Sequence, residues 1–266
     1  MTYKTIKLTA EGRVSLMLLN RPEVMNSIDE QMLRELTEVL GALAADPETV
    51  VVVISGAGNA FCGGADLREF KGSYEEFRRT GRLTPFGGPD LALLFSRFPK
   101  PMIAAVNGMA VGWGMTMPVA CDIRLASANA MFSAPFVRVG LTPEFGSCNL
   151  LPKLIGYGRA AELFLTGRMI GAEEALRIGL IDRLVTQEDL IEQSLGLARQ
   201  IAAQPTGAVI STKSMLRQGA AAVSSLDQWI VYEALVFQQC MKTEEHYQAL
   251  TSLLARMESR GQEKGD

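Results

Sequence analysis

The chain has 266 residues, of which 48% are hydrophobic and 21% are charged, a composition that excludes a mainly disordered protein. Its formal net charge is −3 and its pI is about 5.5, so no overall positive field favours nucleic acid. The four cysteines form no CxxC pair and the N-terminus has no signal-peptide pattern. We therefore expect reduced thiols and a cytoplasmic protein.

The first part of the chain alternates strand and helix patterns. Residues 2–9 and 12–20 predict a β-hairpin. Asp29 is the expected N-cap of a helix whose apolar residues recur at helical spacing until Asp46 and Pro47. The β-branched run at 49–56 predicts a fully buried strand of a parallel sheet. This order of elements predicts a right-handed crossover.

Glycine-rich segments punctuate the middle of the chain. AFCGGADL at 60–67 predicts a tight turn that opens a helix at Asp66. Residues 71–90 are polar, rich in glycine and weakly periodic, which predicts a mobile connection before a helix over 91–98. Residues 101–121 carry no charge, yet their glycines and polar residues favour a buried strand, a tight turn and a buried helix over a membrane span.

The remainder of the chain passes from short strands to helices. Two strands are expected over 121–127 and 130–135. Helical periodicity then dominates, over 158–167, 172–179, 187–204, 206–219, 225–241 and 243–259. We place a domain boundary near residue 200, with a core over 1–200 and a helical region over 201–266.

Acidic residues are scarce across one long stretch. At the chain average of 29 acidic residues in 266, residues 91–161 should contain about eight, but they contain only Asp122 and Glu144. Glu144 follows a proline and precedes an aromatic residue in an apolar surrounding, where burial would raise its pKa and suit it to general-base work. An exposed turn glutamate is the alternative. Asp122 is expected to cap local structure.

Other catalytic templates fail on the residues present. The one histidine, His246, lies far in sequence from any candidate nucleophile, and GxSxG is absent. No metal-ligand spacing, dinucleotide fingerprint or phosphate-binding loop occurs. Cys62 has no basic neighbour that would lower its pKa, so we expect it to serve packing. Two glycine turns that lead into helices remain, and helix N-termini can hold a developing oxyanion.

Four segments together resemble the crotonase family, also called enoyl-CoA hydratase/isomerase. They are LNRPEVMNSID, AFCGGADLREF, KPMIAAVNGMAVGWGM and FSAPFVRVGLTPEFGS, which occur in the family's order. The resemblance runs from about residue 3 to 260. It implies an α/β fold, a ββα spiral core with a C-terminal helical trimerisation region, assembled as a trimer or a dimer of trimers.

The resemblance also implies an acyl-CoA substrate, with no further cofactor and no metal. By position, the backbone amides of Ala65 and Trp113 would form an oxyanion hole for a thioester enolate. The common pattern has glycine where this chain has Trp113, so the side chain should reshape the acyl pocket. The positions expected to contact CoA are Val24, Met25, Gly63, Asp66 and Leu67.

Two departures from the family's hydratases bear on the reaction. Those enzymes carry two glutamates that activate water, whereas this chain has Thr116 and Phe136 at these positions. Glu144 instead matches the base of the peroxisomal type of Δ3-Δ2-enoyl-CoA isomerase. The resemblance therefore implies isomerisation of 3-enoyl-CoA to 2-trans-enoyl-CoA by one glutamate. The alternatives are a hydratase or another crotonase-type reaction, and a non-catalytic acyl-CoA-binding protein.

Overall fold

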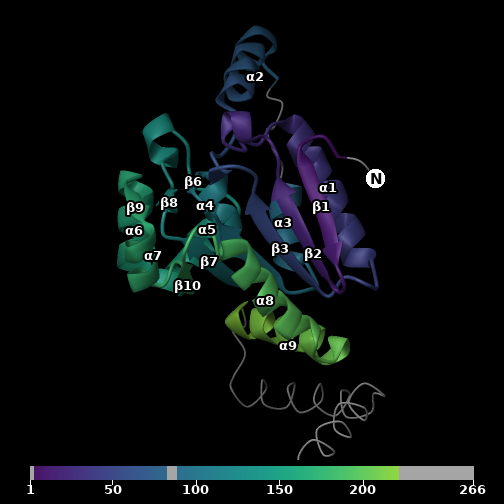
Figure 1. The fold of residues 1–266 in the computed structure, drawn as a ribbon. Coiled ribbons are helices and arrows are strands. Elements are labelled where there is room, and N and C mark those ends of the chain that lie inside the picture. The colour runs from purple at the N-terminus through teal and green to yellow at the C-terminus, as the bar shows by residue number, and fades with distance from the viewer. Residues whose placement is uncertain (1–2, 83–88, 222–266) are drawn as a thin grey trace, which may run out of the picture. The chain divides into compact units, whose positions relative to one another are not determined.

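The computed structural model describes residues 3–82 and 89–221, which form a mixed α/β fold (Figure 1). The chain divides into two compact units, residues 1–199 and 200–266. The helices predicted over 225–241 and 243–259 lie outside the described residues, and so does His246. The role of the C-terminal region in trimerisation stays a prediction.

The larger sheet has six strands in the order β1-β2-β3-β5-β7-β10. These strands are β1 (Ile6–Glu11), β2 (Val14–Leu19), β3 (Val51–Gly56), β5 (Met102–Val106), β7 (Ile123–Ser127) and β10 (Arg183–Val185). β1 and β2 pair antiparallel, which confirms the hairpin, and the other neighbours pair parallel. β3 is buried along its whole length, as its β-branched run predicts.

The smaller sheet consists of four short strands in the order β4-β6-β8-β9. They are β4 (Ala60–Cys62), β6 (Met109–Val111), β8 (Met131–Ser133) and β9 (Met169–Gly171). In the chain, β4 follows β3, β6 follows β5 and β8 follows β7, and a helix comes after each short strand. This repetition of long strand, short strand and helix is the expected ββα spiral.

Helices lie between the strands along the chain and follow the last strand. They are α1 (Glu30–Ala45), α2 (Leu67–Thr80), α3 (Pro89–Arg97), α4 (Trp113–Ala120), α5 (Ser147–Ile155), α6 (Tyr157–Thr166), α7 (Ala172–Ile178), α8 (Leu190–Ala202) and α9 (Thr206–Ala221), with 3-10 turns η1 (Pro22–Val24) and η2 (Phe136–Val139). Asp29 caps α1 as expected, because its carboxylate accepts a hydrogen bond from the Met32 amide at 2.7 Å.

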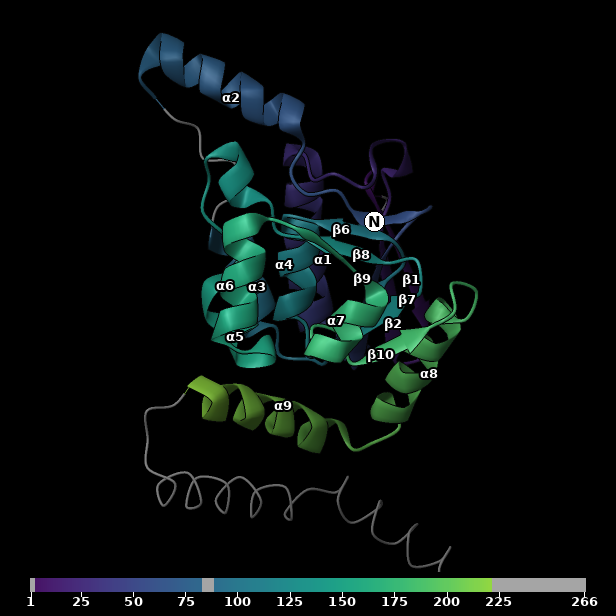
Figure 2. The same cartoon turned by 90° about the vertical axis from the view of Figure 1, so that its left-hand side faces the viewer.

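The mobile connection predicted over 71–90 is wrong for residues 71–80, which continue α2, and for residues 89–90, which begin α3. Charged side chains that form helices readily dominate this segment, and Arg79 pairs with Glu76 one turn away at 2.6 Å. One interior glycine, Gly72, costs only about 1 kcal/mol. α2 stands apart from both sheets in two perpendicular views (Figure 1 and Figure 2). Residues 83–88 lie outside the described part.

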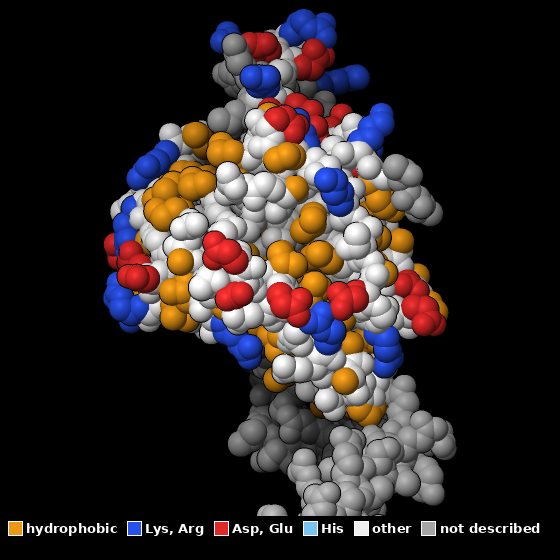
Figure 3. Space-filling model, in the orientation of Figure 1, with side chains coloured by type: hydrophobic (Ala, Val, Ile, Leu, Met, Phe, Trp, Pro, Cys, Tyr) orange, Lys and Arg blue, Asp and Glu red, His pale blue; other side chains and the backbone are white. Residues whose placement is uncertain are grey.

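Helix α4 occupies the interior of the core. All of its residues are buried, and it contacts β4, β5, β6, α3 and α5. The charge-free run at 101–121 is therefore protein interior, as expected. Across residues 3–82 and 89–221, no helix has the length and apolarity needed to cross a membrane. Figure 3 shows positive and negative side chains interspersed on one face, in keeping with the small net charge.

Candidate active site

The two glycine turns predicted from the sequence lie directly against each other. Gly64 has a φ of +96° and Gly112 a φ of +56°, which are left-handed conformations that favour glycine. A Cβ on Gly64 would lie 2.9 Å from the Val111 carbonyl oxygen, and one on Gly112 would lie 3.8 Å from the Gly64 Cα. The residues that follow these glycines, Ala65 and Trp113, are therefore brought close together.

A third glycine seats helix α4 on the first turn. A Cβ on Gly114 would lie 2.0 Å from the Cys62 carbonyl oxygen, a distance that a real Cβ contact does not reach. Glycine is therefore required where the start of α4 crosses β4. Trp113 is the first residue of α4, so its amide lies at the positive end of the helix dipole.

The Ala65 amide is oriented by a short bridge to the segment before α1. The Ile28 amide donates to the Gly64 carbonyl at 2.8 Å, and the Asp66 amide donates to the Ile28 carbonyl at 2.9 Å. In this parallel bridge the N–H of Ala65 points away from Ile28. Among the described residues, nothing accepts a hydrogen bond from it, so it can donate to a ligand.

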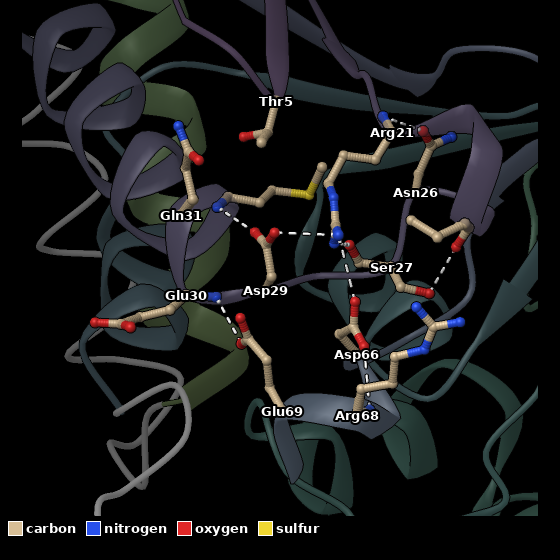
Figure 4. A network of polar contacts seen from close by, with 12 residues as sticks. Thr5, Arg21, Asn26, Ser27, Asp29, Glu30, Gln31, Asp66, Arg68 and Glu69 are labelled. Carbon is tan, nitrogen blue, oxygen red and sulfur yellow. Dashed lines mark hydrogen bonds and ion pairs between the residues drawn. The ribbon is translucent and has the colours of Figure 1, made fainter. Parts of the chain in front are cut away.

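An arginine clamp, which sequence reasoning missed, holds this bridge in place (Figure 4). Arg21 contacts Asp29 at 3.2 Å and Asp66 at 3.3 Å, and it donates to the Ser27 carbonyl at 2.6 Å. These side chains are largely shielded from solvent, which strengthens the ion pairs relative to exposed ones. The clamp fixes Asp66 next to Ala65, so the expected CoA-contacting Asp66 also has a structural role.

The other positions expected to contact CoA also gather around this bridge. Val24 ends η1, and the exposed Met25 follows it. The Gly63 amide donates to the Met25 carbonyl at 2.8 Å, which joins the two expected segments. Leu67 begins α2, and its side chain lies outside the described part. The structure thus brings these backbone segments together, and their contact with CoA stays a prediction.

Glu144 lies in the turn between η2 and α5, where it is half-buried. The Ser147 amide and hydroxyl both donate to its carbonyl, at 3.1 and 2.6 Å, which fixes the turn. Thr116 in α4 donates a hydrogen bond from Oγ1 to Glu144 Oε1 at 3.0 Å. Burial raises the pKa of the Glu144 carboxyl to about 7, although the Thr116 hydrogen bond acts in the opposite direction. The exposed turn glutamate considered as an alternative is thereby excluded.

The residue after Glu144 is held in an uncommon backbone conformation. Phe145 has a φ of 62°, which is costly for a bulky residue and persists only where packing enforces it. Its ring centroid lies 5.2 Å from that of Phe95 and 6.0 Å from that of Trp113, both in edge-to-face arrangements. The buried Trp113 indole therefore packs beside the turn that carries Glu144.

Cys62 connects the acidic group to the first glycine turn. Burial raises the pKa of its thiol to about 12, and the negative charge of nearby Glu144 adds to this effect. Cys62 is therefore a neutral packing residue, as the sequence indicates. The charge of Glu144 affects the pKa of Cys62, which precedes the first glycine turn. Glu144 also accepts a hydrogen bond from Thr116, and the next residue, Phe145, packs against Trp113, so both contacts lead to the helix that follows the second turn. Glu144 is therefore close to both glycine turns.

The arrangement is suited to proton transfer beside a developing oxyanion. It combines a carboxylate with a pKa near neutrality and two amides from adjacent turns. No group of three or more potential metal ligands occurs in the described ranges, 3–82 and 89–221.

Comparison with known proteins identifies the family. The profile of the enoyl-CoA hydratase/isomerase family matches residues 9–262. The short-chain-enoyl-CoA hydratase of Clostridium acetobutylicum is 34% identical over 262 residues, which cover 98% of each chain.

Solved structures agree with this match. An enoyl-CoA hydratase from Bacillus anthracis has a TM-score of 0.86 at 31% identity, over 95% of this chain and 97% of that chain. A monofunctional enoyl CoA isomerase from M. smegmatis has a TM-score of 0.71 at 36% identity, over 85% of this chain and 98% of that chain. The chain therefore belongs to the enoyl-CoA hydratase/isomerase family.

Proposed function

We propose that this protein isomerises 3-enoyl-CoA to 2-trans-enoyl-CoA, with Glu144 as its single base. The carboxylate takes a proton from C2, and the electrons of that bond move into a dienolate. The amides of Ala65 and Trp113 hold the negative thioester oxygen. The same carboxyl then returns its proton at C4, which leaves the double bond between C2 and C3 and regenerates the base.

The observation that carries this proposal is the pairing of Glu144 with Thr116. A hydratase needs groups that hold water and deliver its proton, and here the first candidate position is a hydroxyl already bonded to Glu144. The second, Phe136, is a buried apolar side chain. The other acidic residue of the stretch, Asp122, is occupied in accepting the Met102 amide at 2.7 Å. One base is sufficient for isomerisation, and the half-buried Glu144, with its raised pKa, supports the proposal of a single base.

The proposal includes the manner of substrate binding. Val24, Met25, Gly63, Asp66 and Leu67 would contact the CoA moiety, and the acyl chain would pass beside Trp113. The reaction only moves a proton, so it uses neither a metal nor a further cofactor. We expect the protein to act in the cytoplasm as a homo-oligomer, a trimer or a dimer of trimers.

Hydration of 2-enoyl-CoA is the second candidate function. The hydratase names of the relatives in Clostridium acetobutylicum and Bacillus anthracis favour it. In that reaction Glu144 would have to activate water without a second carboxylate, and the buried Phe136 offers no polar group to help.

Product analysis distinguishes the two candidates. The purified protein is incubated separately with 3-hexenoyl-CoA and crotonyl-CoA, and the products are identified by mass and chromatography. We expect 3-hexenoyl-CoA to give a conjugated isomer of unchanged mass, and crotonyl-CoA to gain little water. Rapid hydration of crotonyl-CoA without migration of the double bond in 3-hexenoyl-CoA would contradict the proposal.

A further inference from the structure

The two oxygens of the Glu144 carboxylate have different surroundings. Oε1 accepts the hydrogen bond from Thr116 Oγ1 at 3.0 Å. No side chain or amide in the described part of the chain donates to Oε2. Thr116 is 1% exposed and lies in the buried helix α4, so its hydroxyl is held by the interior rather than by solvent.

We propose that Thr116 is a positioning residue that fixes Oε1 and thereby makes Oε2 the oxygen that carries the proton from C2 to C4. This inference rests on the proposed isomerase function. Oε2 accepts the C2 proton while the C–H electrons enter the dienolate, and Oε2 then protonates C4 while the electrons return from the thioester oxygen. Neither Thr116 nor any other group is consumed.

A neutral hydroxyl is suited to this task. It donates to the ionised carboxylate and so favours the charged form, whereas burial favours the neutral form. The balance leaves the pKa of Glu144 at about 7, where a base is both ionised and strong enough to take a proton. A cation at this position would hold the pKa far lower and weaken the base.

Other groups that could change the pKa of Glu144 are either neutral or exposed to solvent. The Cys62 thiol stays protonated because its pKa is about 12. Helix α4 contains no charged side chain. The charged side chains of α3, α5 and η2 are exposed: Asp90, Arg97, Lys153 and Arg138. Thr116 is the one described group that hydrogen-bonds the carboxylate.

The test replaces Thr116 by valine, alanine and serine in the full-length protein. Valine keeps the branched shape of threonine, and alanine lacks both γ atoms, so both variants lose the hydroxyl. Serine retains the hydroxyl and lacks only the methyl group. For each variant, kcat/KM for 3-hexenoyl-CoA is measured from pH 5.5 to 9. The ionisation of Glu144 is followed in parallel by the infrared band of its protonated carboxyl, identified by its absence in Glu144→Gln.

We expect Thr116→Val and Thr116→Ala to lose activity at the acidic end of the profile. Relative to its own plateau near pH 9, each should be about tenfold less active at pH 6 than the wild type, which corresponds to a pKa of Glu144 one pH unit higher. The pH at which the infrared band of the protonated carboxyl falls to half its intensity should also rise. Thr116→Ser should follow the wild type in both measurements.

Superimposable pH profiles and infrared titrations for wild type and Thr116→Val would overturn the proposal, and so would a serine variant that behaves like valine. The infrared titration needs no turnover, so it tests the positioning of Glu144 even if the wild type fails to isomerise 3-hexenoyl-CoA. That failure alone would refute the proposed function instead.

Discussion

The raised pKa of Glu144 predicts that its ionisation destabilises the folded protein. The pKa is 4.5 for an ordinary glutamate and about 7 here. Below pH 4.5 the carboxyl is protonated in both states and has no effect. Between the two values the unfolded chain releases its proton first, so the free energy of unfolding falls as the pH rises. Well above pH 7 the loss is complete, at about 3.5 kcal/mol, since one pKa unit corresponds to about 1.4 kcal/mol.

Glu144→Gln removes this loss because the amide stays neutral at every pH, while its oxygen can still accept the Thr116 hydrogen bond. The free energy of unfolding of the variant, minus that of the wild type, should increase by about 2.5 kcal/mol between pH 5 and 8.5. The assay is urea unfolding at a series of pH values, at one fixed protein concentration because an oligomer's stability depends on it.

Glu35→Gln is the matched control with the opposite sign. Burial would raise the pKa of Glu35, but hydrogen bonds from Thr5 and Lys4 outweigh it and lower the pKa. Ionised Glu35 therefore stabilises the fold, and its variant should be less stable by a constant amount across pH 5 to 8.5. If the Glu144→Gln difference is equally flat over this range, Glu144 titrates as an ordinary glutamate and the base assignment loses its physical support.

Three further predictions follow from the glycine turns and the assembly. Gly114→Ala should lower the free energy of unfolding by at least about 2 kcal/mol, because the new Cβ would clash with the Cys62 carbonyl. The control, Gly41→Ala on an open helix surface, should raise the free energy of unfolding by about 0.5 to 1 kcal/mol. Equal urea midpoints for the two variants would contradict this prediction. Ala65→Pro removes one amide donor and should cost about 3 to 4 kcal/mol of transition-state stabilisation, measured from kcat/KM. The control, Trp113→Gly, keeps its amide and should mainly change the preferred acyl length. Normal turnover by a folded Ala65→Pro variant would refute the oxyanion hole of two amides. Light scattering after size exclusion should give a multiple of 28.9 kDa, and a monomer at micromolar concentration would contradict the expected oligomer.

Local signals in the sequence were sufficient for much of the fold. Asp29 before a periodic apolar run marked the start of α1, and the β-branched run at 49–56 marked the buried β3. The glycine-rich runs at 60–67 and 108–114 predicted tight turns that lead into helices, and α2 and α4 follow them in the structure. These features depend on neighbours in the chain, so a sequence pattern can reveal them.

The features that the sequence did not reveal depend on contacts distant in the chain. The three-residue strands β4 and β9 are too short to show alternation, and they form because neighbouring strands pair with them. The positive φ of Phe145 is imposed by packing against Phe95 and Trp113. The Arg21 clamp joins residues that are 45 positions apart in the chain, Arg21 and Asp66. The one signal for it in the sequence is a charged residue, Arg21, just after an apolar strand.

The central claim, isomerisation by Glu144 as a single base, is tested most directly by comparing two rate constants in one protein preparation. These are kcat/KM for isomerisation of 3-hexenoyl-CoA and kcat/KM for hydration of crotonyl-CoA, both measured at pH 8 in the wild type and in Glu144→Gln. We expect isomerisation to dominate in the wild type and to fall at least about a hundredfold in the variant. Dominant hydration in the wild type, or isomerisation that survives in the variant, would contradict the claim.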